Sequence, residues 1–267
     1  MIKESAVYHF IDKGNQYALT IFNGSHFMQD LAKWQNFGPN EIKVLRPLIL
    51  SLQCLLTVIK NNESFGAYVN SDEHGFRFNM ESHSNGNSRL LLKHQDQLPE
   101  KLNGICRFVK FQPNDNAPYT SLIELKDSSY KEVVSQIISQ SYQFDANVEI
   151  FDENNLSVIL TKFPHVKEPL NKIAYFDSIY KNIIDSFSTE EDEEKVIKKI
   201  AEGGYTFLSI KRVHLKCRCT RDKLVMTFRN LEPDSIKDIF EDGPEVEVNC
   251  DYCGKLYKIK EDDLKLM

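Results

Sequence analysis

Cys217-Arg218-Cys219 and Cys250-Asp251-Tyr252-Cys253 are the most informative stretches of this 267-residue chain, and 30 residues (220–249) separate them. Two close cysteine pairs at such a separation are laid out like the two halves of one tetrahedral site in which four thiolates bind zinc. We therefore expect one zinc ion per chain, with Cys217, Cys219, Cys250 and Cys253 as ligands. The first pair has the spacing C-x-C, where zinc modules usually have C-x-x-C.

Such an ion would decide whether the C-terminal part of the chain folds. Residues 213–267 form a module of about 55 residues, which is too short to be stable on a small apolar core alone. Binding of a structural zinc ion supplies on the order of 10 kcal/mol or more of folding free energy. We expect the module to unfold when the metal is removed.

Each cysteine pair is also close enough to form a local disulfide. The bridges Cys217–Cys219 and Cys250–Cys253 would close very small loops, which stabilise little, and neither would restore the link between the two halves. Oxidation would therefore release zinc and unfold the module. The residues leave two alternatives open: a zinc module that never switches, and a catalytic use of Cys250 and Cys253, for which the surrounding sequence lacks the βαβ pattern. His214 is a possible substitute ligand, but four cysteines already complete a tetrahedron, and we expect it to lie on a strand.

Composition and charge exclude several classes of protein. The net charge is −6, and residues 213–267 carry ten Lys/Arg against twelve Asp/Glu, a net of −2, so a nucleic-acid partner is not expected. Residues 1–10 lack the apolar segment of a secretion signal, and the apolar stretch 45–59 is interrupted and too short to span a membrane. We expect a cytoplasmic protein that binds neither nucleic acid nor membrane.

A reducing cytoplasm favours metal-binding or redox-sensing cysteines over permanent disulfides. The two remaining cysteines, Cys54 and Cys106, stand alone within apolar runs. We expect both to be ordinary packing residues, because a free cysteine behaves as a small hydrophobic side chain. The sequence has no glycine-rich phosphate loop and no G-x-S-x-G motif, and we do not expect an enzyme.

Helix-like and strand-like patterns are interleaved over residues 1–163, which predicts an N-terminal α+β domain with a mixed sheet. Pro47 is expected to bend or break its longest helix. The predicted helices are residues 25–35, 39–56 and 127–141, and the predicted strands are 17–22, 64–69, 75–80, 89–92, 105–111, 119–125 and 147–162.

The pattern becomes helical after residue 163, which predicts a helical linker over 164–212 and the zinc module over 213–267. The linker helices are expected at 173–187 and 189–200. The second has only Val196, Ile197 and Ile200 to bury, so we expect it to dock weakly. In the module we expect helices after Thr220 and from Pro233, and strands near 246–248 and 256–259.

The segments 213–222 and 248–257 resemble the 33-kilodalton heat-shock chaperonin family, the redox-regulated bacterial holdases. That family has C-x-C, a gap of about 30 residues and then C-x-x-C, after a large N-terminal domain and a helical linker. Ser141-Tyr142-Gln143 lies where the family often has Ser-Glu-Gln, and 39–60 resembles its long N-domain helix. Arg89-Leu90 departs from the Arg-Gly pattern of the family, which marks a divergent member.

The resemblance implies a function that agrees with the behaviour expected of the cysteines. It implies a chaperone that is inactive when reduced and zinc-bound, and that oxidants activate by forming disulfides, releasing zinc and unfolding the linker. The active form would be a homodimer that binds unfolding client proteins without ATP, with no catalytic residue. A zinc-stabilised chaperone or interaction protein without redox control is the alternative.

Overall fold

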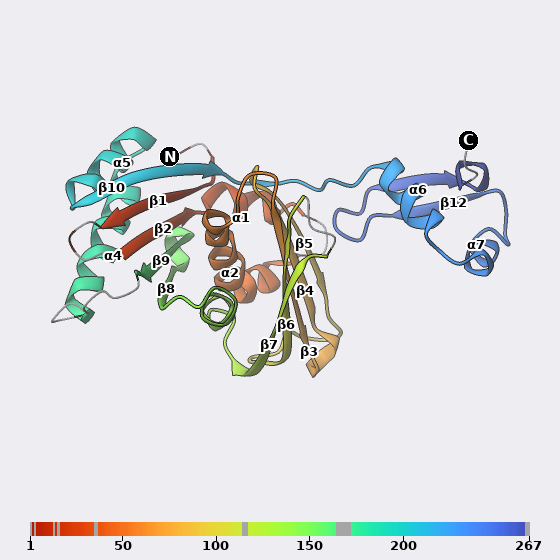
Figure 1. The fold of residues 1–267 in the computed structure, drawn as a ribbon, viewed down its shortest axis with the longest axis horizontal. Helices are drawn as coiled ribbons and strands as arrows, with labels where there is room; N and C mark the ends of the chain where they lie inside the picture. Colours follow the sequence, from red (N-terminus) through yellow and green to blue (C-terminus); the bar gives the residue numbers. More distant parts are fainter. Residues whose placement is uncertain are drawn as a thin grey trace. The chain divides into compact units, whose positions relative to one another are not determined.

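A computed structural model describes residues 2, 4–12, 14, 17–34, 37–113, 117–163 and 172–264. The chain forms two compact units, Met1–Leu215 and Lys216–Met267. Both contain helices and sheets (Figure 1), so the predicted α+β class is confirmed. None of the helices in the described ranges is long and apolar enough to cross a membrane.

The first unit contains a five-stranded sheet with the order β10-β1-β2-β9-β8. All its neighbouring strands are antiparallel. Both faces of this sheet are buried, since successive side chains of β1 and β2 enter two different apolar clusters. The strands are β1 (Ala6–Asp12), β2 (Tyr17–Asn23), β8 (Ala146–Phe151), β9 (Leu156–Lys162) and β10 (Tyr205–Arg212).

A second sheet has the order β11-β5-β4-β3-β6-β7. Its neighbours are antiparallel except for β11, which pairs with β5 in parallel. The strands are β3 (Ser64–Ser71), β4 (Arg77–His83), β5 (Asn87–Lys93), β6 (Leu102–Phe111), β7 (Tyr119–Ser128) and β11 (His214–Leu215).

Helices occupy the space between these two sheets (Figure 1). Their apolar faces join the inner faces of both sheets in the largest core of the molecule. The central helix is hydrophobic on one side because Ile42, Leu45, Ile49 and Leu52 recur at helical spacing. The elements of this layer are α1 (Ser25–Leu31), α2 (Pro39–Gln53), η1 (Cys54–Val58), α3 (Glu132–Ile137) and the π-helical turn η3 (Ile138–Tyr142).

Two further helices, α4 (Lys172–Thr189) and α5 (Glu193–Glu202), cover the other face of the five-stranded sheet. On α5 the buried side chains are Val196 and Ile200, and Ile197, the third apolar residue that the sequence offered, is partly buried. Its first residue, Glu193, accepts a hydrogen bond from the Tyr8 hydroxyl (2.8 Å) and two from the guanidinium of Arg212. The helix is therefore attached to β1 and β10 by one charged group and two apolar side chains.

One segment forms an edge of both sheets, and we call residues 205–215 the strap. It consists of β10, the buried Val213 and β11. The N–H of Val213 donates to Ser5 O (2.8 Å), and the N–H of His214 donates to Gly86 O (2.9 Å). The strap ends directly before Lys216, the first residue of the second unit.

The second unit is small. Helices α6 (Arg221–Arg229) and α7 (Pro233–Ile239) join a hairpin of β12 (Glu245–Asn249) and β13 (Leu256–Lys260), followed by the 3₁₀ turn η5 (Glu261–Leu264). Its apolar cluster has three buried members, Val225, Phe240 and Ile259, with partly buried side chains around them.

Several local predictions were wrong. The helix expected at 127–141 begins only at Glu132, because β7 continues to Ser128. The strand expected at 147–162 is a hairpin that turns at Asp152–Asn154. Of the bend or break expected at Pro47, the break is absent, since helix α2 continues through this residue. The described part of 164–212 contains the two expected helices and, in addition, strand β10, which the sequence analysis did not predict.

Candidate metal centre

Two turns present the four cysteines. Cys217 and Cys219 lie in the extended segment before α6, whose start is fixed by the Thr220 side chain accepting a hydrogen bond from the N–H of Lys223 (3.3 Å). Threonine is a preferred residue at this position because its oxygen satisfies a free N–H of the first helical turn. The sequence prediction of a helix after Thr220 is confirmed.

Cys250 and Cys253 lie in the tight turn between β12 and β13. The N–H of Gly254 donates to Cys250 O (2.7 Å), and the N–H of Cys250 donates to Lys255 O (3.0 Å). Gly254 has a φ of +67°, a conformation that glycine adopts without steric cost. The hairpin register thus fixes the direction of both sulfurs.

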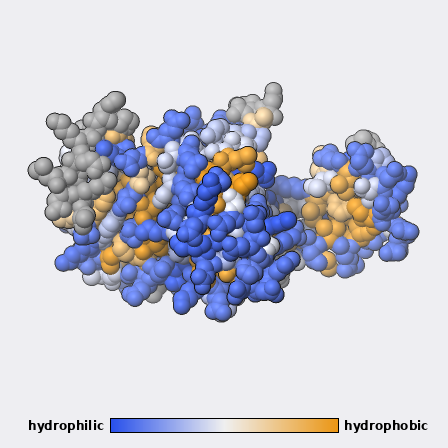
Figure 2. Space-filling model, turned by 90° about the horizontal axis from the view of Figure 1, so that it is seen from below, coloured by the Kyte–Doolittle hydropathy of each residue, from blue (hydrophilic) through white to orange (hydrophobic). Residues whose placement is uncertain are grey.

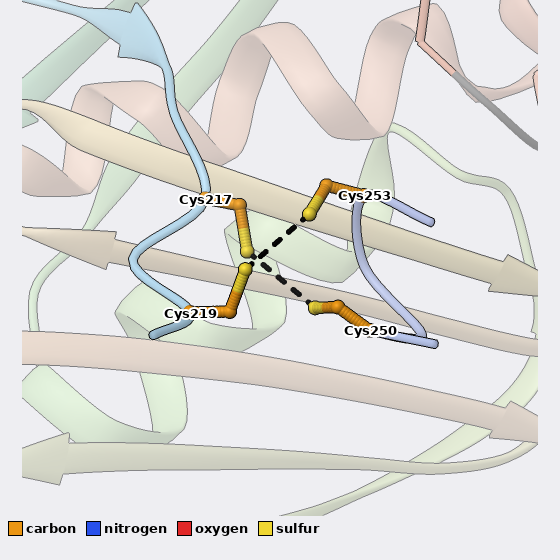
Figure 3. Close-up of side chains that lie close together, drawn as sticks. All are labelled: Cys217, Cys219, Cys250 and Cys253. Atoms are coloured by element: carbon orange, nitrogen blue, oxygen red, sulfur yellow. Dashed lines mark hydrogen bonds between the residues drawn. The ribbon is translucent and has the colours of Figure 1, made fainter. Parts of the chain in front are cut away.

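The four side chains point toward one another (Figure 3). Their sulfur atoms all lie within 4.8 Å of each other, and the Sγ–Sγ distances are 3.7 Å for Cys217–Cys250 and 3.4 Å for Cys219–Cys253. In a tetrahedral zinc–thiolate site with bonds of about 2.3 Å, the sulfurs are roughly 3.8 Å apart. The four cysteines can therefore hold a metal ion, and the donor set fits zinc.

The electrostatics of the cluster are uneven. Burial raises the pKa of the Cys217 thiol, and it raises that of Cys253 to about 12. Burial also opposes ionisation of Cys219, but hydrogen bonds from the Tyr257 hydroxyl and the neighbouring cysteines outweigh it and lower the pKa to about 7. Thiolates crowded together repel one another, and a divalent cation would remove that repulsion.

The remaining cysteines and the histidine considered as a ligand lie elsewhere. Cys54 and Cys106 are buried in the first unit, where burial raises the pKa of each thiol to about 12. This agrees with their expected role in packing. His214 is exposed on β11 and is not part of the cysteine cluster.

The sequence analysis missed Tyr257, which it treated as one residue of a strand. Its hydroxyl lies 3.1 Å from Cys219 Sγ and donates to Cys219 O (3.0 Å). The pairing of Tyr257 with Val248 across the hairpin brings it to the cysteines. A tyrosine four residues after the last cysteine was the available signal, but its partner lies 38 residues earlier in the chain.

Comparison with known proteins gives a consistent assignment. The family described as "Hsp33 protein" matches residues 5–260. The 33 kDa chaperonin of Thermosipho melanesiensis is 20% identical over 92% of this chain and 92% of its own length. The 33 kDa chaperonin of Limosilactobacillus fermentum is 21% identical over 61% of this chain, and the match spans 59% of that protein.

The fold has a counterpart among solved structures. The crystal structure of the 33 kDa chaperonin of Thermotoga maritima superposes with a TM-score of 0.70 at 16% identity, covering 98% of this chain and 96% of that one. Identity at this level shows a shared fold, and the family match extends over nearly the whole sequence. The chain belongs to the Hsp33 family.

Proposed function

We propose that this chain is a redox-regulated, ATP-independent holdase chaperone. When it is reduced, Cys217, Cys219, Cys250 and Cys253 hold one zinc ion and the protein is inactive. Oxidation forms the Cys217–Cys219 and Cys250–Cys253 disulfides, releases zinc and unfolds the linker. The observation that carries this proposal is the convergence of four sulfurs within 4.8 Å in a member of the Hsp33 family.

Zinc is the metal that this donor set favours. Four thiolates in a tetrahedron complete the coordination of zinc and leave no position for a substrate, which makes the site structural rather than catalytic. The ion would also hold together a unit whose apolar cluster has only three buried members among the described residues, Val225, Phe240 and Ile259. Its free energy of binding is therefore a large part of the stability of the second unit.

Oxidation is proposed to pair cysteines within each turn. The sulfur contacts of 3.7 Å between Cys217 and Cys250 and of 3.4 Å between Cys219 and Cys253 join the two halves. Those contacts persist only while the halves stay together. Once the ion leaves, each cysteine still has its neighbour in the same turn two or three residues away, so we expect the local bridges.

Loss of the second unit would act on the first through the strap. β11 has two residues and ends directly before Lys216, so fraying would start there once the following residues are unfolded. Most side chains of β10 are only partly buried or exposed. The strap is thus held by backbone pairing, by the buried side chains of Tyr205 and Val213, and by charged contacts such as those of Arg212.

Release of the strap and of α4 and α5 would uncover apolar surface. The face of the five-stranded sheet under these helices includes Tyr8, Phe10, Leu19 and Leu160, all buried. Apolar surface that becomes exposed in this way can bind the apolar segments of unfolding proteins, and such binding needs no nucleotide. We propose residues 1–163 as the client-binding domain, 164–212 as the linker and 213–267 as the zinc switch.

The first unit also exposes apolar groups as it stands. A cavity of about 180 Å³ lies between the five-stranded sheet, η1 and η3, and its lining includes the exposed Val58, Phe144 and Phe163. On the face drawn in Figure 2, apolar side chains form patches bordered by polar ones. We propose the exposed apolar residues around this cavity as a further client contact. The oxidised protein is proposed to be a cytoplasmic homodimer that binds neither nucleic acid nor membrane.

The decisive experiment measures zinc and client protection together. The zinc-loaded protein is treated with hypochlorous acid; released zinc is followed with a chromophoric chelator, and aggregation of a thermally unfolding client is followed by light scattering. We expect full release of one zinc per chain and strong suppression only after oxidation. Equal suppression in both states would instead support a constitutive, zinc-stabilised chaperone. Turnover of insulin disulfides would support an oxidoreductase.

A further inference from the structure

The hydroxyl of Tyr257 touches the metal centre from outside the set of four ligands. It lies 3.1 Å from Cys219 Sγ and 3.0 Å from the carbonyl oxygen of the same residue. The ring is buried, at 8% exposure, and the Lys255 ammonium lies 5.2 Å from its centroid. This cation is attracted to the face of the ring and helps to hold the tyrosine in place.

The direction of this hydrogen bond follows from the chemistry of a metal-bound thiolate. A sulfur that coordinates zinc carries no proton and can only accept, as can a carbonyl oxygen, so the single hydroxyl proton of Tyr257 is shared between Cys219 O and Cys219 Sγ. Cys217 and Cys253 receive hydrogen bonds from the backbone of Cys219 and Lys255. Among the four ligands, and within the described residues, Cys219 is the one whose sulfur contacts the hydroxyl group of a side chain.

We propose that Tyr257 is a positioning residue that sets how much oxidant the centre withstands before it releases zinc. This inference rests on the proposed function, since it concerns the threshold of the same switch. Donors outside the ligand set orient metal ligands and tune their reactivity, and their loss commonly weakens metal binding. A side-chain donor can be altered by a single substitution, whereas the backbone donors at the other sulfurs cannot.

The oxidation step shows where the hydrogen bond acts. With hydrogen peroxide as oxidant, the Cys219 sulfur attacks one peroxide oxygen, the O–O bond breaks, and a sulfenic acid and hydroxide form. The Cys217 sulfur then attacks the Cys219 sulfur, which forms the disulfide and expels a second hydroxide. Two electrons pass from the two sulfurs to peroxide. The Tyr257 hydrogen bond withdraws negative charge from the Cys219 sulfur, which makes that sulfur a weaker nucleophile in the first attack, and it orients the sulfur toward the metal.

The test is Tyr257→Phe, which removes the hydroxyl and keeps the ring. We expect its dissociation constant for zinc to rise roughly 10-fold or more, and its peroxide-driven zinc release to accelerate by a similar factor. Thr227→Val is the matched control, because it deletes an exposed hydroxyl of the same unit that bonds to Lys223 O (2.9 Å) and to no sulfur. The control should match the unmodified protein in both measurements.

A donor-strength series separates a hydrogen bond from mere packing. Replacing Tyr257 site-specifically with 3-fluorotyrosine makes the phenol a stronger donor, so zinc release should be slower than in the unmodified protein. If the fluorinated protein releases zinc as fast as the unmodified protein or faster, the inference is overturned. This comparison remains valid even if Tyr257→Phe does not bind zinc at all. Unchanged affinity and release rate in Tyr257→Phe overturn it as well. Failure of the unmodified protein to release zinc with peroxide would refute the proposed redox switch instead, and the zinc affinities would still test the role of Tyr257.

Discussion

Substitution of Gly86 by alanine should free the strap without touching the cysteines. Gly86 has a φ of +83°, and a Cβ built on it would lie 1.7 Å from the carbonyl oxygen of Arg212. No backbone tolerates such an approach. Either the turn before β5 or the strap has to move, and the strap is the more weakly buried of the two.

The size of the effect can be worked out from the contacts. The left-handed backbone alone costs alanine about 1–2 kcal/mol, which lowers the stability of the whole first unit. Displacement of the strap further breaks the hydrogen bond from His214 N–H to Gly86 O, worth about 1 kcal/mol. It also exposes Val213, whose burial contributes about 2 kcal/mol. The strap should therefore open roughly 100-fold more often.

Hydrogen–deuterium exchange of peptides covering 205–215 measures this opening, with zinc content and client protection recorded on the same samples. Gly75→Ala is the matched control. Gly75 has a φ of +59°, but the nearest atom to its Cβ position is 3.5 Å away, so that variant carries the strain without the clash. We expect Gly86→Ala to retain zinc and to protect clients partly under reducing conditions. Exchange in the strap no faster than in Gly75→Ala would refute this reasoning.

Three further predictions concern the metal, the thiols and pH. Chelation of zinc should abolish the protection of residues 216–264 from hydrogen exchange and leave the core of the first unit protected. The reason is that an apolar cluster with three buried members does not replace the ion. Retained protection of residues 216–264 after chelation would contradict this prediction. Alkylation after denaturation, followed by mass spectrometry, should find six thiols in the reduced protein and two in the oxidised protein. These two are Cys54 and Cys106, because burial and a raised pKa protect both from the oxidant in the folded protein. A hydrogen bond from Arg212 lowers the pKa of the Glu193 carboxyl below its ordinary value of 4.5. The ionised carboxylate therefore stabilises the docked α5 fully above pH 4.5, and this stabilisation is lost as the pH falls through the lowered pKa. Exchange of 193–202 at stepwise lower pH should show this loss, and Glu193→Gln should lack it.

Recognition of the metal centre depended on local information. Cysteine spacing along the chain, the capping residue Thr220 and the proline that begins α7 are all signals within a few residues of the element they specify. The apolar spacing of α2 is likewise a local pattern, and the helix formed even through Pro47 because its buried face dominates. For these parts the sequence alone was sufficient.

Other features depend on residues that are far apart in the chain. β1 and β10 became strands because each pairs with the other across the sheet, and strand formation depends more on such partners than on intrinsic preference. Gly86 is required only because the Arg212 carbonyl passes over it, and Tyr257 gained a role only because the hairpin carries it to Cys219. The sequence by itself determined which residues can bind the metal, through their chemistry and spacing. The tertiary structure decided which segment borders both sheets and which side chain supports the sulfurs, because those contacts exist only once distant residues have been brought together.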